Sequence, residues 1–165
     1  MGVKHFGARV TRFEDPALLA GKGRFVDDIP LPGALNACFV RSPHGHAKVR
    51  AIDATAALAM PGVHAVLTGE DYEKDGIGTM PSMAPYKRRD GAPMYLPYRP
   101  AIAVGRALHV GYPVAVIVAD TLDIARDAAE RVAVDYAPRP SVVSAEDAFK
   151  PGAPQLYDDC PNNEA

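Results

Sequence analysis

Two strand–helix–strand patterns limit the folds that this chain can adopt. The first pattern spans residues 47–68 and begins with an alternating run at 47–52, where one face is apolar and the other is charged. Asp53 is expected to cap an alanine-rich helix at 54–60, because its carboxylate can accept from the free amides of the first turn. A third run at 63–67 alternates again and completes the pattern.

The second pattern lies in the C-terminal half of the chain. Its first strand, at 114–119, is rich in β-branched residues and is predicted to be buried on both faces. A helix capped by Asp120 or Thr121 follows, with apolar residues at helical spacing that indicate one buried stripe. A strand at 132–136 ends the pattern. We therefore expect an α+β fold whose mixed sheet is built around the two units.

The remaining segments suggest one domain over residues 1–165. Turn residues break up the segment 1–32, which predicts an irregular lead-in, and residues 150–165 read as a tail or linker. The proline-rich segment 72–99 is a long loop with too many methionines and tyrosines for a free linker. Two interpretations stay open: this loop packs on another chain, or it folds back on its own domain.

Composition excludes several classes of protein. The 165 residues carry 18 basic and 20 acidic side chains, so no strongly basic face points to a nucleic acid. The longest wholly apolar stretch is far shorter than the ~20 residues of a membrane-spanning helix, and the first residues lack the apolar core of a signal peptide. Two lone cysteines, Cys38 and Cys160, do not form a secreted disulfide framework, which predicts a cytoplasmic location.

Histidines and one arginine at the corner after residue 40 are the first candidates for chemistry. A zinc site needs three or four ligands, whereas His44 and His46 would point to opposite sides of an extended chain. A turn histidine that bonds backbone groups is the favoured interpretation. Arg41 at the same corner could bind an anion, but pairing with a carboxylate is the commoner role.

Other candidate motifs are weaker still. The adjacent acids Asp27-Asp28 and Asp158-Asp159 diverge on an extended chain, so turn residues that bond their own backbone are expected. Gly21-Lys22-Gly23 lacks the third glycine and the preceding strand of a dinucleotide fingerprint. The sequence therefore predicts no catalytic, cofactor-binding or metal-binding residue in this chain.

Six segments, in order along the chain, resemble one known family. They are residues 7–15, residues 19–29, Arg41-Ser42-Pro43-His44-Gly45-His46-Ala47 with Ile52-Asp53, residues 60–63, residues 110–115 and residues 125–135. They are similar to the amino-terminal α/β-hammerhead domain of the molybdenum hydroxylase large subunit, in the aldehyde oxidase, xanthine dehydrogenase and carbon monoxide dehydrogenase family. The fold implied is that of the N-domain of the carbon monoxide dehydrogenase molybdoprotein.

The resemblance implies an oxidoreductase complex. Enzymes of the family use a molybdopterin cofactor and pass electrons through 2Fe-2S clusters to FAD. Their cofactor contacts and catalytic glutamate lie in domains after the hammerhead, so the resemblance transfers no such residue onto positions 1–165. It implies a chain that binds no cofactor itself and is inactive alone. A start at Met1 resembles a separately encoded large subunit, and Pro161-Asn162-Asn163 resembles the start of a linker.

Two functions from different classes follow. The first is a scaffold domain whose partners are the molybdopterin-binding domains of the large subunit and the flavin and iron–sulfur subunits, without nucleic acid or membrane. The second is a free-standing, non-catalytic module that binds a small ligand or anion at the corner formed by Arg41 and His44. No nucleophile with a nearby base supports a hydrolase.

Overall fold

The computed structural model describes residues 7, 11–83, 86–88 and 90–164. Contacts between Cα atoms divide the chain into two compact units, Met1–Ala34 and Leu35–Ala165. The two units are described separately. No helix among the described residues is long and apolar enough to cross a bilayer.

The first unit holds one short helix, α1 (Asp15–Leu19), and one 3₁₀ turn, η1 (Val26–Asp28). Pro16 stands in the first turn of α1, where its missing N–H costs nothing. The carboxylate of Asp28 accepts from the Phe25 amide at 2.8 Å and closes the 3₁₀ turn. None of the described residues of this unit is buried, so its few turns are held by local hydrogen bonds.

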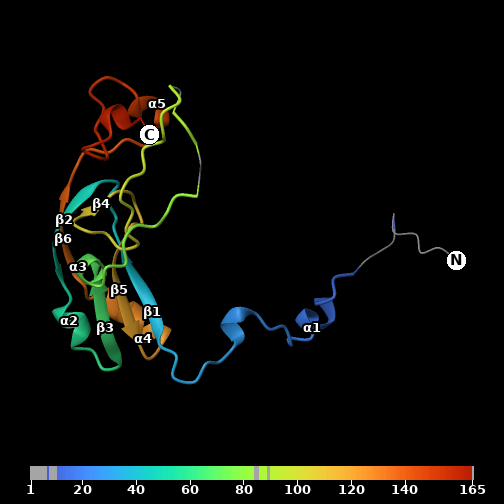
Figure 1. Ribbon diagram of the computed structural model, residues 1–165. Coiled ribbons are helices and arrows are strands. Elements are labelled where there is room, and N and C mark those ends of the chain that lie inside the picture. Colours follow the sequence, from blue (N-terminus) through green and yellow to red (C-terminus); the bar gives the residue numbers. More distant parts are fainter. Residues whose placement is uncertain (1–6, 8–10, 84–85, 89, 165) are drawn as a thin grey trace. The chain divides into compact units, whose positions relative to one another are not determined.

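The second unit contains two antiparallel three-stranded sheets. In the first, β5 (Pro113–Ala119) lies between β1 (Asn36–Arg41) and β3 (Val63–Thr68). Helices α2 (Thr55–Leu58) and α4 (Leu122–Ala129) pack on one face of this sheet through the alanines of their apolar stripes. The stripe predicted for the second helix is thereby confirmed. Figure 1 shows α4 beside the strands β1 and β5.

In the second sheet, β2 (Ala47–Asp53) lies between β4 (Arg106–Ala107) and β6 (Ala133–Pro138). The pairing of β2 with β6 shifts register between Val49 and Ala51, which is a β-bulge. No pattern in the sequence predicted the two-residue strand β4. It pairs with the first two residues of β2 only.

The predicted α+β class is confirmed, but the prediction of a mixed sheet is wrong. Each strand–helix–strand unit divides its two strands between different sheets: β2 and β3 in the first unit, β5 and β6 in the second. Every strand pair among the described residues is antiparallel. Hydrophobic periodicity finds strands but carries no information about which strand each one pairs with.

Two clusters of buried side chains form the core. Ile117 and Ala119 of β5 pack with alanines of α2 and α4, while Val114 of β5 packs with Tyr112 and Ala107 on the other side. Val40 contacts both clusters. Strand β5 is therefore the element that joins the two halves of the core.

The described residues of Leu35–Ala165 leave part of one face of the first sheet uncovered. Val116 and Val118 of β5 are only partly buried, whereas the sequence predicted burial on both faces of this strand. Phe39 and Leu67, the two cross-strand partners of Val116, are 45% and 42% exposed. The continuous apolar sequence of β5 therefore has two causes: one face lies in the core, and the other lies on an apolar surface.

Helix α3 (Gly69–Lys74) was missed by the sequence analysis, which began the long loop at residue 72 inside it. Thr68 and Asp71 form a capping box, in which the Asp71 carboxylate accepts from the Thr68 amide at 2.8 Å. Gly69 lies so close to the backbone of Ala103 that a Cβ would overlap its carbonyl oxygen. Tyr72 is buried and donates to the Gly78 carbonyl at 2.6 Å.

The segment that follows α3 folds back on its own unit. The Met80 amide donates to the Arg99 carbonyl at 2.8 Å, and the Tyr95 hydroxyl donates to Asp159 at 2.5 Å. The Arg88 guanidinium reaches the Glu164 carbonyl at 3.1 Å. These contacts favour the second of the two interpretations of the loop 72–99, while contact with another chain stays a prediction.

The C-terminal segment is ordered by short helical turns rather than extended as a free linker. Helix α5 (Ala145–Ala148) is capped by the Ser144 hydroxyl, and η2 (Pro161–Asn163) lies close to the end of the chain. The Asn163 side chain donates to the carbonyls of Ala148 and Pro154, both at 3.1 Å. A single amide side chain thus ties α5 to the segment that follows it.

Candidate functional site

The corner between β1 and β2 is held by side chains that bond the backbone. Ser42 is buried, and its hydroxyl accepts from the His44 amide at 3.1 Å. The Arg41 guanidinium donates to the Gly111 carbonyl at 2.9 Å, rather than to a carboxylate as the sequence suggested. The Ser42 amide donates to the Tyr112 carbonyl at 2.9 Å. These contacts fasten the corner to the start of β5.

The two histidines of the corner have different environments. The His44 ring contacts the Tyr136 ring edge-on, with centroids 4.9 Å apart. His46 is only 5% exposed, and its Nδ1 lies 3.3 Å from the Pro140 carbonyl, as expected of a histidine that bonds backbone. Its Nε2 is buried and has no hydrogen-bond partner among the described residues. This unpaired atom is the one feature of the corner that its structural role leaves unexplained.

The other histidines do not join them. His64 Nε2 lies 2.6 Å from the Asp120 carboxylate on the surface, and the His109 ring packs edge-on against Tyr112. His5 lies outside the described residues. Cys38 and Cys160 are both free thiols. The described part of the chain brings together no three histidine, cysteine or acidic side chains that could hold a metal ion.

The paired acids act separately. Asp28 bonds the backbone of its own turn, as expected, but Asp158 and Asp159 do not. Asp158 pairs with Arg106 at 3.1 Å, and Asp159 accepts from Tyr95. This second expectation was wrong because the partners lie more than 50 residues away, where local sequence cannot show them.

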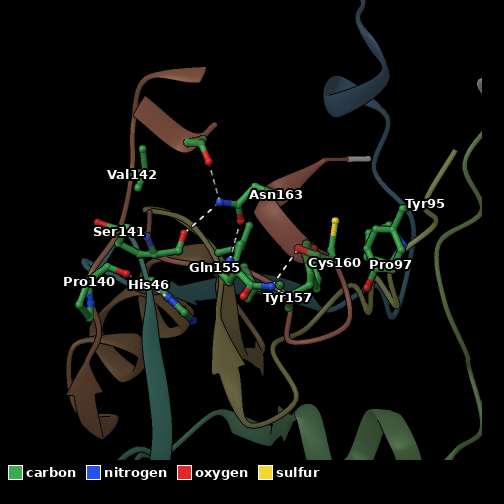
Figure 2. Close-up of a pocket in the computed structure, with 15 residues that line it drawn as sticks. His46, Tyr95, Pro97, Pro140, Ser141, Val142, Gln155, Tyr157, Cys160 and Asn163 are labelled. Carbon is green, nitrogen blue, oxygen red and sulfur yellow. Dashed lines mark hydrogen bonds between the residues drawn. The ribbon is translucent and has the colours of Figure 1, made fainter. Parts of the chain in front are cut away.

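A cavity of about 250 Å³ lies beside His46 and was not predicted. Figure 2 shows His46, Pro140 and Ser141 at one side of it and Tyr95 and Pro97 at the other. The full lining comprises Gly45, His46, Tyr95, Pro97, Leu108, Pro140, Ser141, Val142, Ala148, Pro154, Gln155, Leu156, Tyr157, Cys160 and Asn163.

The corner, the loop 72–99 and the tail 150–165 all contribute to this cavity, together with Leu108, residues 140–142 and Ala148. Gly45 allows the close approach of the C-terminal segment, because a Cβ there would lie 2.9 Å from the Ser141 hydroxyl oxygen. The signal that could have revealed the cavity is the apolar content of the tail, where Leu156 and Tyr157 are too apolar for a linker. Their partners, however, lie far away in the sequence.

The cavity lining carries no permanently charged side chain. It contains no aspartate, glutamate, lysine or arginine. Burial raises the pKa of Tyr157 and of the Cys160 thiol above their ordinary values, so both are protonated at neutral pH. The hydrogen bond to Asp159 raises the pKa of Tyr95 to about 12.

This lining does not fit a molybdopterin or an iron–sulfur cluster. The pterin carries a phosphate, which needs cationic side chains or a cluster of free amides, and the lining has no cationic side chain. A 2Fe-2S cluster needs four cysteine thiolates, or two cysteines and two histidines, and the described residues bring together no three histidine, cysteine or acidic side chains. That the chain binds no cofactor or metal elsewhere stays a prediction.

The fold and the corner define an α/β-hammerhead domain. Residues 20–140 match the family model described as "Aldehyde oxidase and xanthine dehydrogenase, a/b hammerhead domain". The chain therefore belongs to this family, and the resemblance identified from its sequence is confirmed.

Named relatives support the same family assignment. The carbon monoxide dehydrogenase large chain of Hydrogenophaga pseudoflava is 42% identical over 88% of this chain, which covers 17% of that protein. A crystal structure of the Cu,Mo-CO dehydrogenase has a TM-score of 0.78 and 38% identity, over 93% of this chain and 18% of the other. Quinoline 2-oxidoreductase from Pseudomonas putida 86 has a TM-score of 0.75 and 35% identity, over 94% and 19%. The chain thus spans less than a fifth of each.

Proposed function

We propose that this chain is a scaffold domain of the large subunit of a molybdenum-dependent hydroxylase. It packs against the cofactor-binding domains and supplies no catalytic residue itself. The family match over residues 20–140 supports the class of protein. The use of Arg41, Ser42 and His44 as structural contacts supports the non-catalytic role.

The observation that carries the proposal is the apolar face of the sheet β1–β5–β3 that the described residues of Leu35–Ala165 leave uncovered. Side chains directly opposite each other in an antiparallel pair lie on the same face, and this face takes its members from all three strands. It comprises Ala37, Phe39, Ala65, Leu67, Val116 and Val118, all of them apolar and none fully buried. A contiguous apolar patch of this kind marks a surface that another protein surface covers.

The partners and cofactors follow from the family. The proposed partners are the molybdopterin-binding domains of the large subunit and its flavin and iron–sulfur subunits. The molybdopterin, 2Fe-2S and FAD groups belong to that complex, and the proposed location is the cytoplasm. No observation favours the alternative, an anion-binding module at the corner, because Arg41 donates to a backbone carbonyl and His44 packs on Tyr136.

A chimera tests the proposal. This chain replaces the matching segment in the large chain of a Cu,Mo-CO dehydrogenase, and the assembled complex is assayed for molybdenum content. We expect the chimera to assemble and to hold molybdenum. Phe39→Glu places a charge on the uncovered face and should abolish assembly, while the melting temperature of the isolated chain changes little because Phe39 is 45% exposed.

Val143→Glu is the matched control, since Val143 is fully exposed and lies off that face. Equal molybdenum content in the Phe39→Glu and Val143→Glu chimeras would contradict the proposal. Turnover of carbon monoxide or an aldehyde by the purified 165-residue chain alone would contradict it as well.

A further inference from the structure

The cavity beside His46 combines an apolar wall with a small number of polar atoms. Pro97, Leu108, Pro140, Val142 and Leu156 are among the apolar residues of the wall. Ligand sites in proteins have this composition: mainly apolar lining, with a few polar groups that fix the orientation of the ligand. The scaffold function proposed above makes no use of this cavity.

One polar residue of the cavity wall is His46. Its side chain belongs to the wall of the cavity, it is 5% exposed, and its Nε2 has no partner among the described residues. A buried polar atom without a partner costs about 1–3 kcal/mol, so native structures rarely keep one without a reason. Ser141 places a hydroxyl in the same lining, beside Gly45.

Size and charge restrict the ligand further. The volume of about 250 Å³ is slightly below the ~300 Å³ at which sites for drug-sized molecules begin, so the space suits one or two rings. No lysine, arginine, aspartate or glutamate lines it, so a cation would lose its hydration without gaining a counter-charge, and an anion could gain one only from a protonated His46. The rings of Tyr95 and Tyr157, with centroids 5.8 Å apart, offer aromatic contact.

We propose that this cavity binds a small neutral aromatic molecule with one hydrogen-bonding group, which pairs with Nε2 of His46. Nε2 has almost no accessible surface in this structure, so the proposed binding includes a rotation of the ring toward the cavity. The binding is independent of the scaffold function and can be tested on the purified chain.

The test is an NMR titration with three probes of similar shape. The Nε2 signal of His46 is followed in a long-range nitrogen–proton spectrum while p-cresol, toluene or benzoate is added. We expect p-cresol to shift this signal in a saturable way, with a dissociation constant of about 1 mM. Toluene, which lacks the hydroxyl, should bind roughly five-fold more weakly. Benzoate should give no saturable shift.

Paired variants locate the binding. Val142→Trp fills the cavity and should abolish the p-cresol shift, whereas Val143→Trp, on the fully exposed neighbouring residue, should leave it unchanged. His46→Phe keeps a ring in the wall but removes both nitrogens, so p-cresol should then bind no better than toluene. Backbone amide spectra confirm that each variant is folded.

Two results would overturn the proposal. One is the absence of any saturable shift of the cavity residues with p-cresol in the wild-type chain. The other is equal p-cresol affinity in folded Val142→Trp and Val143→Trp. Neither result bears on whether the chimeric large chain assembles, so failure here is distinguishable from failure of the scaffold function.

Discussion

Gly111 stands where the chain turns into the central strand β5, and its φ is +83°. Its amide donates to the Ser42 carbonyl at 2.8 Å, and its own carbonyl accepts from Arg41. Glycine adopts this left-handed conformation without the steric cost that a Cβ would add. This one residue therefore sets how the corner after β1 meets β5.

Gly111→Val should destabilise the chain by about 1 kcal/mol or more, because a β-branched residue resists a positive φ. Gly111→Asn should cost less, since asparagine tolerates this region better than other residues. Urea denaturation of the three proteins measures the difference. Equal denaturation midpoints for the valine variant and the wild type would show that the turn does not need glycine.

Local hydrogen bonds were the residue-scale features that sequence could predict. Thr121 accepts from the Ile124 amide at 3.2 Å, as expected of the cap. Asp53 accepts from the Thr55 amide at 2.9 Å, although Ala54 is the N-cap of α2. The unpaired His46 Nε2 could not be predicted, because its burial depends on a segment almost 100 residues later in the chain.

For most strands, the predicted first and last residues agree with the structure to within two residues. The predicted run 132–136 is β6 (Ala133–Pro138), and the run 47–52 is β2 (Ala47–Asp53). Helix α3 was not predicted because it has only six residues and begins with Gly69, a poor helix former. That glycine is needed for its close approach to Ala103, which is a tertiary requirement.

The loop 72–99 offers a prediction at the scale of an element. Tyr95 joins this loop to the C-terminal segment through Asp159, and that hydrogen bond raises its pKa from 10.0 to about 12. The folded chain thus holds the phenol proton more tightly than the unfolded chain. The stabilisation is complete below pH 10 and is lost as the pH rises from 10 through about 12.

Tyr95→Phe should therefore remove the tyrosinate absorbance step near pH 12, and limited proteolysis should cut the loop faster. Tyr86→Phe, an exposed tyrosine of the same loop, is the control and should leave that step in place. An unchanged titration curve in Tyr95→Phe would mean that the contact with Asp159 does not form in solution.

At the scale of the whole molecule, the division into Met1–Ala34 and Leu35–Ala165 gives a third prediction. Both core clusters belong to the second unit, so a chain that starts at Leu35 should fold cooperatively. Its melting temperature should differ from that of the full chain by less than about 4 °C. Calorimetry measures this difference, and loss of the cooperative transition on deletion would show that the first unit contributes to the core.

Strand pairing was the part of the fold that sequence could not supply. The two patterns predicted the elements correctly, but the periodicity of a strand specifies its faces and not its neighbours. The cavity could not be predicted for the same reason, because its lining residues lie far apart in the sequence and come together only in the folded chain. The family, in contrast, was predictable because its motifs are linear.

The central position of β5 has a consequence for synthesis on the ribosome. Both edge strands of its sheet, β1 and β3, emerge before it, yet neither has a hydrogen-bonding partner until residues 113–119 have left the exit tunnel. Contacts of such long sequence separation form slowly, because loop-closure entropy is lost before any pairing is gained. During that interval Val40 and Val66, which later pack on the core, are open to wrong partners, so the nascent chain is most exposed to aggregation before β5 emerges.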